Sequence, residues 1–448
     1  MRRWKKQLLA SAAEMVFFAL SLIPALASED VAVGNGWEKK EYTGEEATIR
    51  FSWWGDEDRM AATLAVVVAF EEEYPMIHVI PEFSGISGYH ELLRVELEQG
   101  KAPDLMQIDA KEMESLENAN PAWFADWELA GFDFSDYEEA FLQLPVNGSY
   151  GEVQLGIPVD LDGSAMIVNE EFSDEIGIDL TEAYSWDDLI EWGIIVREYD
   201  DEMYLLCAGT PEIAEYIVTL YAKQLTGKTA FDETEGVLNI TEEQLAECFQ
   251  YVAKLYENEV VPSVDVSAAY DGNRHQDPGW IDGMYLCSFA RISEMDEMLK
   301  ANEEAGWLFG LLPMMEEAMD DGWTADCTQV IALSSGCEHP EAAVLFADYL
   351  LNHPDSVSTL GLTRGIPASE TARTVCEEER ILDESVTQAS EIALNYAGLT
   401  SDGYWSSDDG KNIVTEAIEQ IGSGEKTPEE AAAEVMLRLQ ELIPSVTE

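Results

Sequence analysis

Residues 48–109 carry two alternating patterns of hydrophobic and polar positions. The run at 49–53 is apolar at every second residue, as in a half-buried strand, and an amphipathic helix follows directly. A β-like run at 78–83 and a second helical stretch then lead to a short apolar run within 103–109. This β-α-β-α-β order predicts a parallel sheet covered by helices.

Strand-like and helix-like segments continue to alternate further along the chain. The stretch at 155–169 begins and ends β-like around a turn-prone centre, as a strand that crosses between two domains would. A second crossing is predicted at 307–313 and a further strand at 330–333. Helix-start signals, in which Ser or Thr precedes an acidic or amide residue, occur at 185–188, 241–244 and 427–430. For 448 residues this organisation predicts two α/β domains.

The carboxyl ends of the predicted parallel strands carry candidate binding residues, because ligands of such sheets bind at these ends. Trp53 and Trp54 are neighbours, so on a strand they point to opposite faces. We expect one of them in the core and the other at the strand end. Asp109 ends the third strand. An aromatic surface beside hydrogen-bonding groups suits the binding of a sugar ring.

Two further kinds of candidate residue leave alternatives open. Trp280, Trp323 and Trp405 are flanked by Gly, Asp or Ser, and each either caps the core from outside or stacks on a ligand. Arg364 is one of 24 basic residues. It either forms an ion pair at a domain interface or donates hydrogen bonds inside a cleft.

The N-terminus has the pattern of a secretory signal peptide. A basic segment at 1–6 precedes an apolar run at 16–26 and a small-residue cleavage site after Ala27. The alternative is a membrane anchor, for which the apolar run is short. Residues 28–44 are predicted to be a linker. Because no later stretch is long and apolar enough to span a bilayer, we expect an exported, soluble protein.

The chain is strongly acidic, with 90 Asp and Glu against 24 Lys and Arg and a formal net charge of -66. This charge disfavours nucleic acids and anionic membranes as partners. It is explained either by a solvated acidic surface or by a cationic ligand such as a polyamine or a basic peptide. The six cysteines have no CxxC spacing and fit either buried thiols or one to three disulfides. None lies near the leader, so no lipid-modified cysteine is predicted.

Catalytic and cofactor signatures are missing from the sequence. The five histidines have no metal-ligand spacing, and no GxSxG motif occurs. Residues 222–229 loosely match a phosphate-binding loop, but helically spaced apolar residues precede them at 213–221. With 90 acidic residues, a pair of carboxylates near a cleft is no indication of a glycosidase. We therefore predict no catalytic residue, no metal and no cofactor.

Taken in order, several short segments resemble one family, the extracellular solute-binding proteins of family 1. These are the carbohydrate-capturing subunits of bacterial ABC importers, to which maltose-binding protein is related. The resemblance covers most of the chain after the leader. It rests on Trp53-Trp54-Gly55 with Arg59, and on residues 70–79, 100–107, 162–169, 185–189, 342–352 and 362–367.

The resemblance implies a two-lobed α/β fold of the periplasmic-binding-protein type (type II), with a hinge and a central ligand cleft. It places the N-terminal lobe at 45–158 and 314–354, and the C-terminal lobe at 159–313 and 355–448, with a third crossing near 354. It implies capture of a mono- or oligosaccharide, delivery to an ABC permease, and a monomeric state. The implied ligand-binding residues are Trp54, Asp56, Glu57, Asp109, Asp162, Trp280, Arg364 and Trp405.

Two alternatives to this function remain at the level of sequence. A secreted glycoside hydrolase would use two carboxylates in the cleft. A protein of the same fold would instead bind a peptide or a polyamine.

Overall fold

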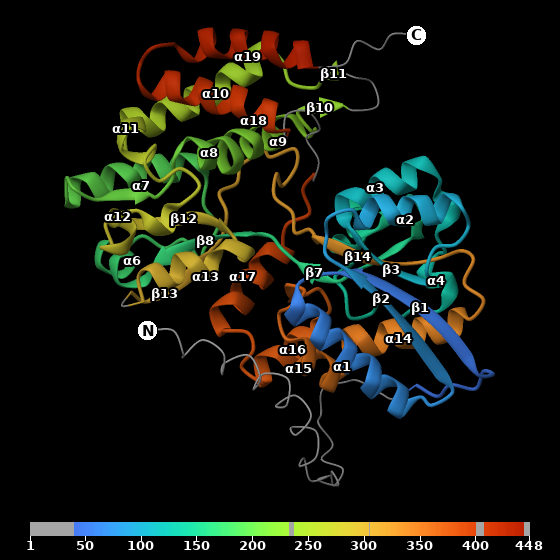
Figure 1. The fold of residues 1–448 in the computed structure, drawn as a ribbon. Coiled ribbons are helices and arrows are strands. Elements are labelled where there is room, and N and C mark those ends of the chain that lie inside the picture. Colours follow the sequence, from blue (N-terminus) through green and yellow to red (C-terminus); the bar gives the residue numbers. More distant parts are fainter. Residues whose placement is uncertain (1–39, 233–236, 304, 400–406, 443–448) are drawn as a thin grey trace, which may run out of the picture. The chain divides into compact units, whose positions relative to one another are not determined.

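The computed structural model describes residues 40–232, 237–303, 305–399 and 407–442 (Figure 1). The predicted signal peptide at 1–27 and most of the predicted linker lie outside the described residues. None of the helices within the described ranges has both the length and the apolar content of a transmembrane span.

A five-stranded sheet forms the centre of the first lobe. Its strands run in the order β2-β1-β3-β14-β6. They span Ile77–Ser84 (β2), Ala47–Trp54 (β1), Leu105–Asp109 (β3), Gln329–Leu333 (β14) and Gly156–Pro158 (β6). β1 pairs in parallel with β2 and β3, as the β-α-β-α-β pattern predicts. β14 is antiparallel to both β3 and β6, so the far side of the sheet is antiparallel.

Helices cover both faces of this sheet, with α2 and α3 on one side and α1 and α14 on the other (Figure 1). The helices of this lobe are α1 (Glu57–Glu73), α2 (Tyr89–Glu98), α3 (Ala110–Ala119), α14 (Pro340–Asn352), α15 (Pro354–Leu360) and α16 (Glu370–Glu378). The phenyl ring of Phe51 lies 5.5 Å from that of Phe346 on α14. On the opposite face, the Ser52 hydroxyl lies 2.6 Å from that of Tyr89 on α2. Neighbouring side chains of β1 therefore contact helices on opposite faces of the sheet.

A four-stranded sheet forms the centre of the second lobe, in the order β13-β8-β12-β9. The strands span Trp307–Gly310 (β13), Ser164–Asn169 (β8), Tyr285–Arg291 (β12) and Tyr204–Leu206 (β9). Alternate residues of β8 enter different cores: Ala165 and Ile167 join the core that continues into the first lobe. Met166 and Val168 join a second core with the C-terminal helices. This two-residue alternation is expected of a sheet that is covered on both faces.

The helices of the second lobe come from the middle and the end of the chain. They are α6 (Glu170–Ile176), α7 (Trp186–Tyr199), α8 (Thr210–Ile213), the π-helical turn η3 (Ala214–Thr219), α9 (Leu220–Thr226), α10 (Glu242–Glu257), α11 (Val264–Ser267), η4 (Arg274–Gln276), α12 (Pro278–Ile281), α13 (Ile292–Ala301), α17 (Glu384–Leu394), α18 (Asp408–Gly422) and α19 (Pro428–Leu442). The start signals predicted at 185–188 and 241–244 form capping boxes at α7 and α10.

Short elements complete the two lobes. They are η1 (Pro121–Trp123), α4 (Trp127–Ala130), α5 (Glu139–Leu142), η2 (Pro145–Asn147), β4 (Ser149–Tyr150), β5 (Val153–Gln154), β10 (Phe231–Asp232) and β11 (Val237–Leu238). All six cysteines are free thiols, which decides between the two possibilities that the sequence leaves open.

The chain passes between the two sheets at 159–163 and again at 311–328. The first crossing contains the short strand β7 (Asp160–Leu161), which pairs with β15 (Ile366–Pro367). A third crossing follows α16. We expected it near 354, but α15 packs on α1 and α16, and its Val357 and Leu360 are buried in the core of the first lobe. The chain therefore leaves that lobe only after α16, and α17 packs on β8 and β13.

Candidate functional site

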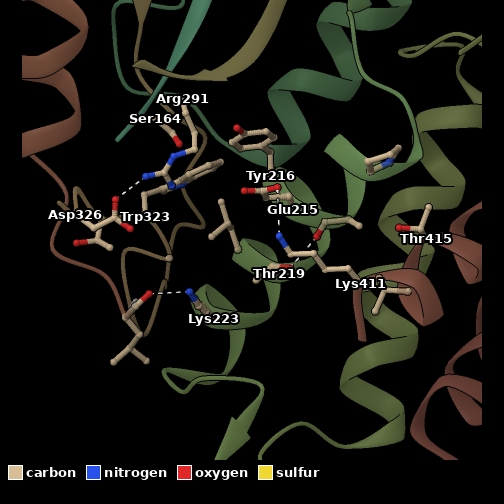
Figure 2. Close-up of a pocket in the computed structure, with 17 residues that line it drawn as sticks. Ser164, Glu215, Tyr216, Thr219, Lys223, Arg291, Trp323, Asp326, Lys411 and Thr415 are labelled. Carbon is tan, nitrogen blue, oxygen red and sulfur yellow. Dashed lines mark hydrogen bonds and ion pairs between the residues drawn. The ribbon is translucent and has the colours of Figure 1, made fainter. Parts of the chain in front are cut away.

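A cavity of about 350 Å³ lies in the second lobe, within the size range of small-molecule sites (Figure 2). Its walls come from the first residue of β8, from η3 and α9, from the last residue of β12, from the crossing segment at 322–326 and from α18. The cavity is thus built by segments that are distant in sequence. It combines aromatic, hydroxyl and charged side chains.

One wall is a continuous helical stretch formed by α8, η3 and α9. The helical spacing of apolar residues at 213–221 predicted this helix, and its last turn ends at Gly227 with a φ of 65°. Residues 222–229, which loosely match a phosphate-binding loop, therefore lie at the end of a helix. Within the stretch, η3 is a π-helical turn, a rare feature that is frequent at functional sites. Its residues Glu215, Tyr216 and Thr219 line the cavity.

Trp323 contributes an indole to the cavity wall. It is 3% exposed, and its ring lies 5.7 Å from that of Phe289, which stacks on Tyr216. The Nε1 donor of Trp323 is buried and has no hydrogen-bond partner among the described residues. Gly322 allows this approach, because its φ is 77° and a Cβ there would lie 2.9 Å from the carbonyl oxygen of Leu220.

Three basic side chains line the same cavity. Arg291 Nε donates to Asp162 at 2.8 Å, and its Nη2 donates to Asp326 at 2.5 Å. Burial lowers the pKa of Arg291, but these two carboxylates outweigh the burial and raise it overall. Lys223 Nζ donates to the carbonyl of Leu399 at 2.7 Å. Figure 2 shows the contacts of Arg291 with Asp326 and of Lys223 with the carbonyl of Leu399.

The third cation, Lys411, is held more loosely. Its Nζ lies 4.0 Å from Glu215 Oε2, and the two side chains are 54% and 47% exposed. The hydroxyls of Ser164, Thr219 and Thr415 complete the polar lining. The cavity therefore offers ring surfaces together with hydrogen-bond donors and acceptors to a polar molecule.

Trp54 lies at the carboxyl end of β1, as the sequence predicts, and Trp53 is fully buried on the other face. Trp54 is 8% exposed and packs against Tyr89 and His90, with ring centres at 5.3 and 4.9 Å. Burial lowers the pKa of His90, and its Nε2 accepts from the backbone N–H of Asp109 at 3.2 Å. Trp54 thus belongs to an aromatic cluster at this edge of the first sheet.

The three acidic residues predicted near Trp54 lie at helix starts. Asp56 caps α1 and accepts from the N–H of Arg59 at 2.9 Å, and the exposed Glu57 is the first residue of that helix. Asp109 caps α3, accepting from the N–H groups of Lys111 at 3.0 Å and Glu112 at 3.4 Å. Carboxylates at these positions satisfy otherwise unpaired amides, so a structural role accounts for their place.

Asp162 lies in the first crossing segment. Its backbone forms a two-way bridge with Asp326 in the second crossing, with N···O distances of 2.7 and 2.8 Å. Its carboxylate accepts from Arg291, from Gly163, and from both the N–H and the hydroxyl of Ser293. Asp162 therefore holds the crossing segments and Arg291 in place, next to the cavity.

Two predicted ligand contacts are core residues instead. Trp280 is 1% exposed, stacks on Trp307 at 4.9 Å, and donates from Nε1 to the carbonyl of Met298. Its indole is therefore enclosed by protein. Arg364 is 4% exposed and donates to Gln107 and to Thr63.

Arg364 makes no ion pair with the described residues, which leaves the second alternative, hydrogen-bond donation; its Nη1 is buried and has no partner among those residues. Burial, with help from the charge of Arg59, lowers its pKa to about 9. Trp405, the eighth predicted contact, lies outside the described residues.

The edge of the first sheet and the cavity are joined through the second crossing. The N–H of Ala110 donates to the carbonyl of Thr328 at 3.0 Å. Lys111, the next residue of α3, is close enough to Asp326 for its charge to act on that carboxyl group. The carboxyl end of β3 is therefore close to one wall of the cavity.

Sequence reasoning missed most of the cavity. Tyr216, Lys223 and Lys411 lie within helices. In a helix, a tyrosine or a lysine is usually explained by core packing or by exposure to solvent, so the sequence does not indicate binding. Arg291 ends a buried strand. Trp323 alone carried a signal, because Asp and Gly precede it and a tryptophan in such a loop needs a burial partner or a ligand.

Comparisons with known proteins agree with this architecture. A family model described as bacterial extracellular solute-binding protein matches residues 54–277. An arabinooligosaccharide-binding protein of Halalkalibacterium halodurans is 27% identical over 193 residues. That alignment covers 42% of this chain and 41% of the relative, so it spans less than half of the curated protein.

Solved structures share the fold at low sequence identity. A family 1 extracellular solute-binding protein from Alicyclobacillus acidocaldarius has a TM-score of 0.79 and 23% identity, with 90% of this chain and all of that chain covered. A periplasmic oligogalacturonide-binding protein from Yersinia enterocolitica has a TM-score of 0.74 and 22% identity, with 88% and 98% covered. A de novo designed cysteine esterase has a TM-score of 0.77 and 23% identity, with 90% and 99% covered.

The predicted two-lobed α/β fold of the periplasmic-binding-protein type is thus confirmed. The family model matches half of the chain, since residues 54–277 are 224 of 448. The chain belongs to the bacterial extracellular solute-binding protein family.

Proposed function

We propose that the protein binds a mono- or oligosaccharide outside the cell and delivers it, unaltered, to the permease of an ABC importer. The family supports capture of a solute, and two relatives are named for oligosaccharides, one of arabinose and one of galacturonate. We further propose export by the N-terminal signal at 1–27, a monomeric state, and two lobes that divide at the crossing segments.

The cavity beside Trp323 is the observation that carries this proposal. The face of an indole packs well against the C–H groups of a pyranose, and Trp323 stands beside the stacked rings of Phe289 and Tyr216. Charged and hydroxyl side chains surround it and are suited to the sugar hydroxyls, since hydrogen bonds to charged groups are the stronger ones. Such a lining gives both affinity and orientation.

The edge of the first sheet supplies the second surface in this proposal. Trp54, Asp56, Glu57 and Asp109 lie at the carboxyl ends of β1 and β3, and β3 is tied to the second crossing through Ala110 and Thr328. A ligand that touches both surfaces stabilises whichever arrangement of the lobes brings them together, in proportion to its preference for that arrangement.

The hydrolase alternative finds less support. A glycosidase of the usual kind needs a protonated carboxyl group beside an ionised one. Both carboxylates that line the cavity, Glu215 and Asp326, face a cation, Lys411 and Arg291 respectively. Both carboxylates are therefore already engaged by cations of the protein. Incubation with oligosaccharides should therefore produce no new reducing ends, and turnover would disprove the binding function.

Calorimetric titration of the purified protein with a panel of sugars tests the proposal directly. Trp323→Ala should weaken the binding of the best sugar about thirtyfold, since a central aromatic contact is worth about 2 kcal/mol. Trp280→Ala is the matched control, because it removes a buried indole that does not line the cavity. Equal affinity in Trp323→Ala, or stabilisation by spermidine and by no sugar, would refute the proposal.

A further inference from the structure

The residues that line the cavity have a small net positive charge, whereas the chain as a whole is strongly acidic. Three of its 17 lining residues are Lys or Arg and two are Asp or Glu, a balance of three minus two, or +1. In the whole chain 24 basic residues face 90 acidic ones. Carboxylates already face two of these cations, Arg291 and Lys411, and a ligand of negative charge would add a further favourable interaction with them.

Two of these cations retain hydrogen-bonding capacity toward a ligand. Arg291 uses Nε and Nη2 to hold Asp162 and Asp326, while its Nη1 makes no hydrogen bond with the described residues. The Lys411–Glu215 pair is long and about half exposed, and exposed pairs of this kind contribute little to stability. A ligand carboxylate can therefore replace Glu215 as the partner of Lys411 at a small cost in stability.

Asp162, next to the cavity, adds a third carboxylate, which is engaged by Arg291, Gly163 and Ser293. The other neighbouring groups are donors. Trp323 Nε1 is a buried donor without a partner among the described residues. Lys111 on α3 places further positive charge near Asp326. The acidic groups of the wall, Glu215 and Asp326, already face Lys411 and Arg291. An ionised carboxylate is a pure acceptor with about four sites, and thus fits an excess of donors better than a hydroxyl, which donates as well.

We infer that the preferred ligand of this cavity is an acidic carbohydrate, in which a uronate carboxylate binds beside Lys411 and Arg291. The inference rests on the proposed function and deepens it by naming the class of sugar. The rings of the sugar lie against Trp323, and the carboxylate provides the selectivity against neutral sugars.

Calorimetry with matched pairs of disaccharides tests the inference. Each pair has the same linkage and ring configuration and differs in a carboxylate or a hydroxymethyl group at C6, in the gluco, galacto and manno series. We expect the acidic member of the best pair to bind at least tenfold more tightly. We also expect its advantage to shrink in 0.5 M salt, where charges are screened beyond about 4 Å.

Two variants locate the effect. Lys411→Gln should weaken the acidic disaccharide at least fivefold and the neutral one less than twofold. Lys254→Gln removes the same charge from an exposed position on α10 that does not line the cavity, and should change neither.

The possible contrary results are distinguishable. If the neutral member binds as tightly as the acidic one, the inference fails and the proposed function stands. If Lys254→Gln weakens acidic binding as much as Lys411→Gln does, the preference comes from overall charge, and the assignment to this cavity is wrong. If no member of any pair binds, the proposed function fails as well.

Discussion

The carboxyl edge of the first sheet and the cavity of the second lobe use similar residues in different ways. At the sheet edge, Trp54 packs on Tyr89 and His90, and Asp56 and Asp109 cap helices. At the cavity, Trp323 has an indole donor without a partner among the described residues, and Lys411 is held by a loose ion pair. In the first region the two aspartates are engaged by helix N–H groups, whereas at the cavity a cation is held only loosely. The Nε1 of the fully buried Trp53 also lacks a partner among the described residues, so an unpaired indole N–H marks a binding residue only where it borders a cavity, as at Trp323.

This difference shows what separates structural residues from binding residues of the same type. Many polar side chains lie at the ends of strands for structural reasons alone. A helix starts there, and its first N–H groups need a hydrogen-bond acceptor. Incomplete hydrogen bonding beside a cavity is rarer, since buried polar groups are nearly always satisfied. The tests below change residues in or between the two regions and compare stability with ligand affinity.

The largest effect is expected at Trp53, which is fully buried between the layers of the first lobe. Its ring lies 5.0 Å from Phe51 and 5.2 Å from Phe83. Trp53→Ala should lower the free energy of unfolding by about 3–5 kcal/mol, because it leaves a large cavity in a packed core. Urea denaturation measures this loss.

For the fraction of Trp53→Ala that remains folded, sugar affinity should stay close to that of the wild type. A large loss of affinity without a loss of stability would mean that the core face of β1 also binds ligand. The contrast drawn between the two regions would then be wrong.

The next largest effect is expected at Asp160, in the first crossing. Burial raises the pKa of Asp160 to about 7, although hydrogen bonds from Thr328 and Gln329 act in the opposite direction. The pKa of an aspartate in the unfolded chain is about 3.9. At pH values between this and about 7, Asp160 is protonated in the folded state and ionised in the unfolded state. Stability should therefore fall as pH rises from about 4 to about 7, by on the order of 4 kcal/mol for this site, and then level off.

Asp160→Asn is the matched control for this pH dependence. The amide oxygen can still accept from the backbone of Thr328 and Gln329, but the side chain no longer titrates. Thermal unfolding from pH 4 to pH 8 should show a smaller decline in the variant than in the wild type. Parallel curves would mean that Asp160 does not hold the proton.

The smallest effect on stability is expected from Asp109→Asn. Asn caps a helix about as well as Asp, so the free energy of unfolding should change by less than about 0.5 kcal/mol. If Asp109 also contacts the ligand, as we propose, sugar affinity should fall severalfold in calorimetry. Unchanged affinity and stability together would make Asp109 a cap alone.

The sequence predicted the first lobe best because its local patterns agree with its structure. The alternation at 48–109 predicts strands and helices whose partners in the structure are close to them in the sequence. It could not show β14, which joins this sheet after a long excursion through the second lobe. Nor could it show that α15 and α16 stay with the first lobe, since that depends on which surface buries Val357 and Leu360.

The site was harder to predict for the same reason. Trp54 and Asp109 were identified because they sit at ends of predicted strands, and Asp56 through the family resemblance. Trp280 has a loop-like sequence context but is buried against Trp307, a partner that no local pattern names. Arg291 and Lys411 meet at the cavity only through tertiary packing, although 120 residues separate them in the chain.

The π-helical turn η3 makes the composition of the cavity depend on a single residue. Each residue of an α-helix advances the side chain by about 100°, so removing one residue from the turn would rotate everything after it by about that angle. Lys223 and Leu220 would then leave the wall and other side chains of α9 would replace them, with both sheets untouched. A one-residue deletion in 214–219 is thus a short mutational path to a different specificity on the same scaffold.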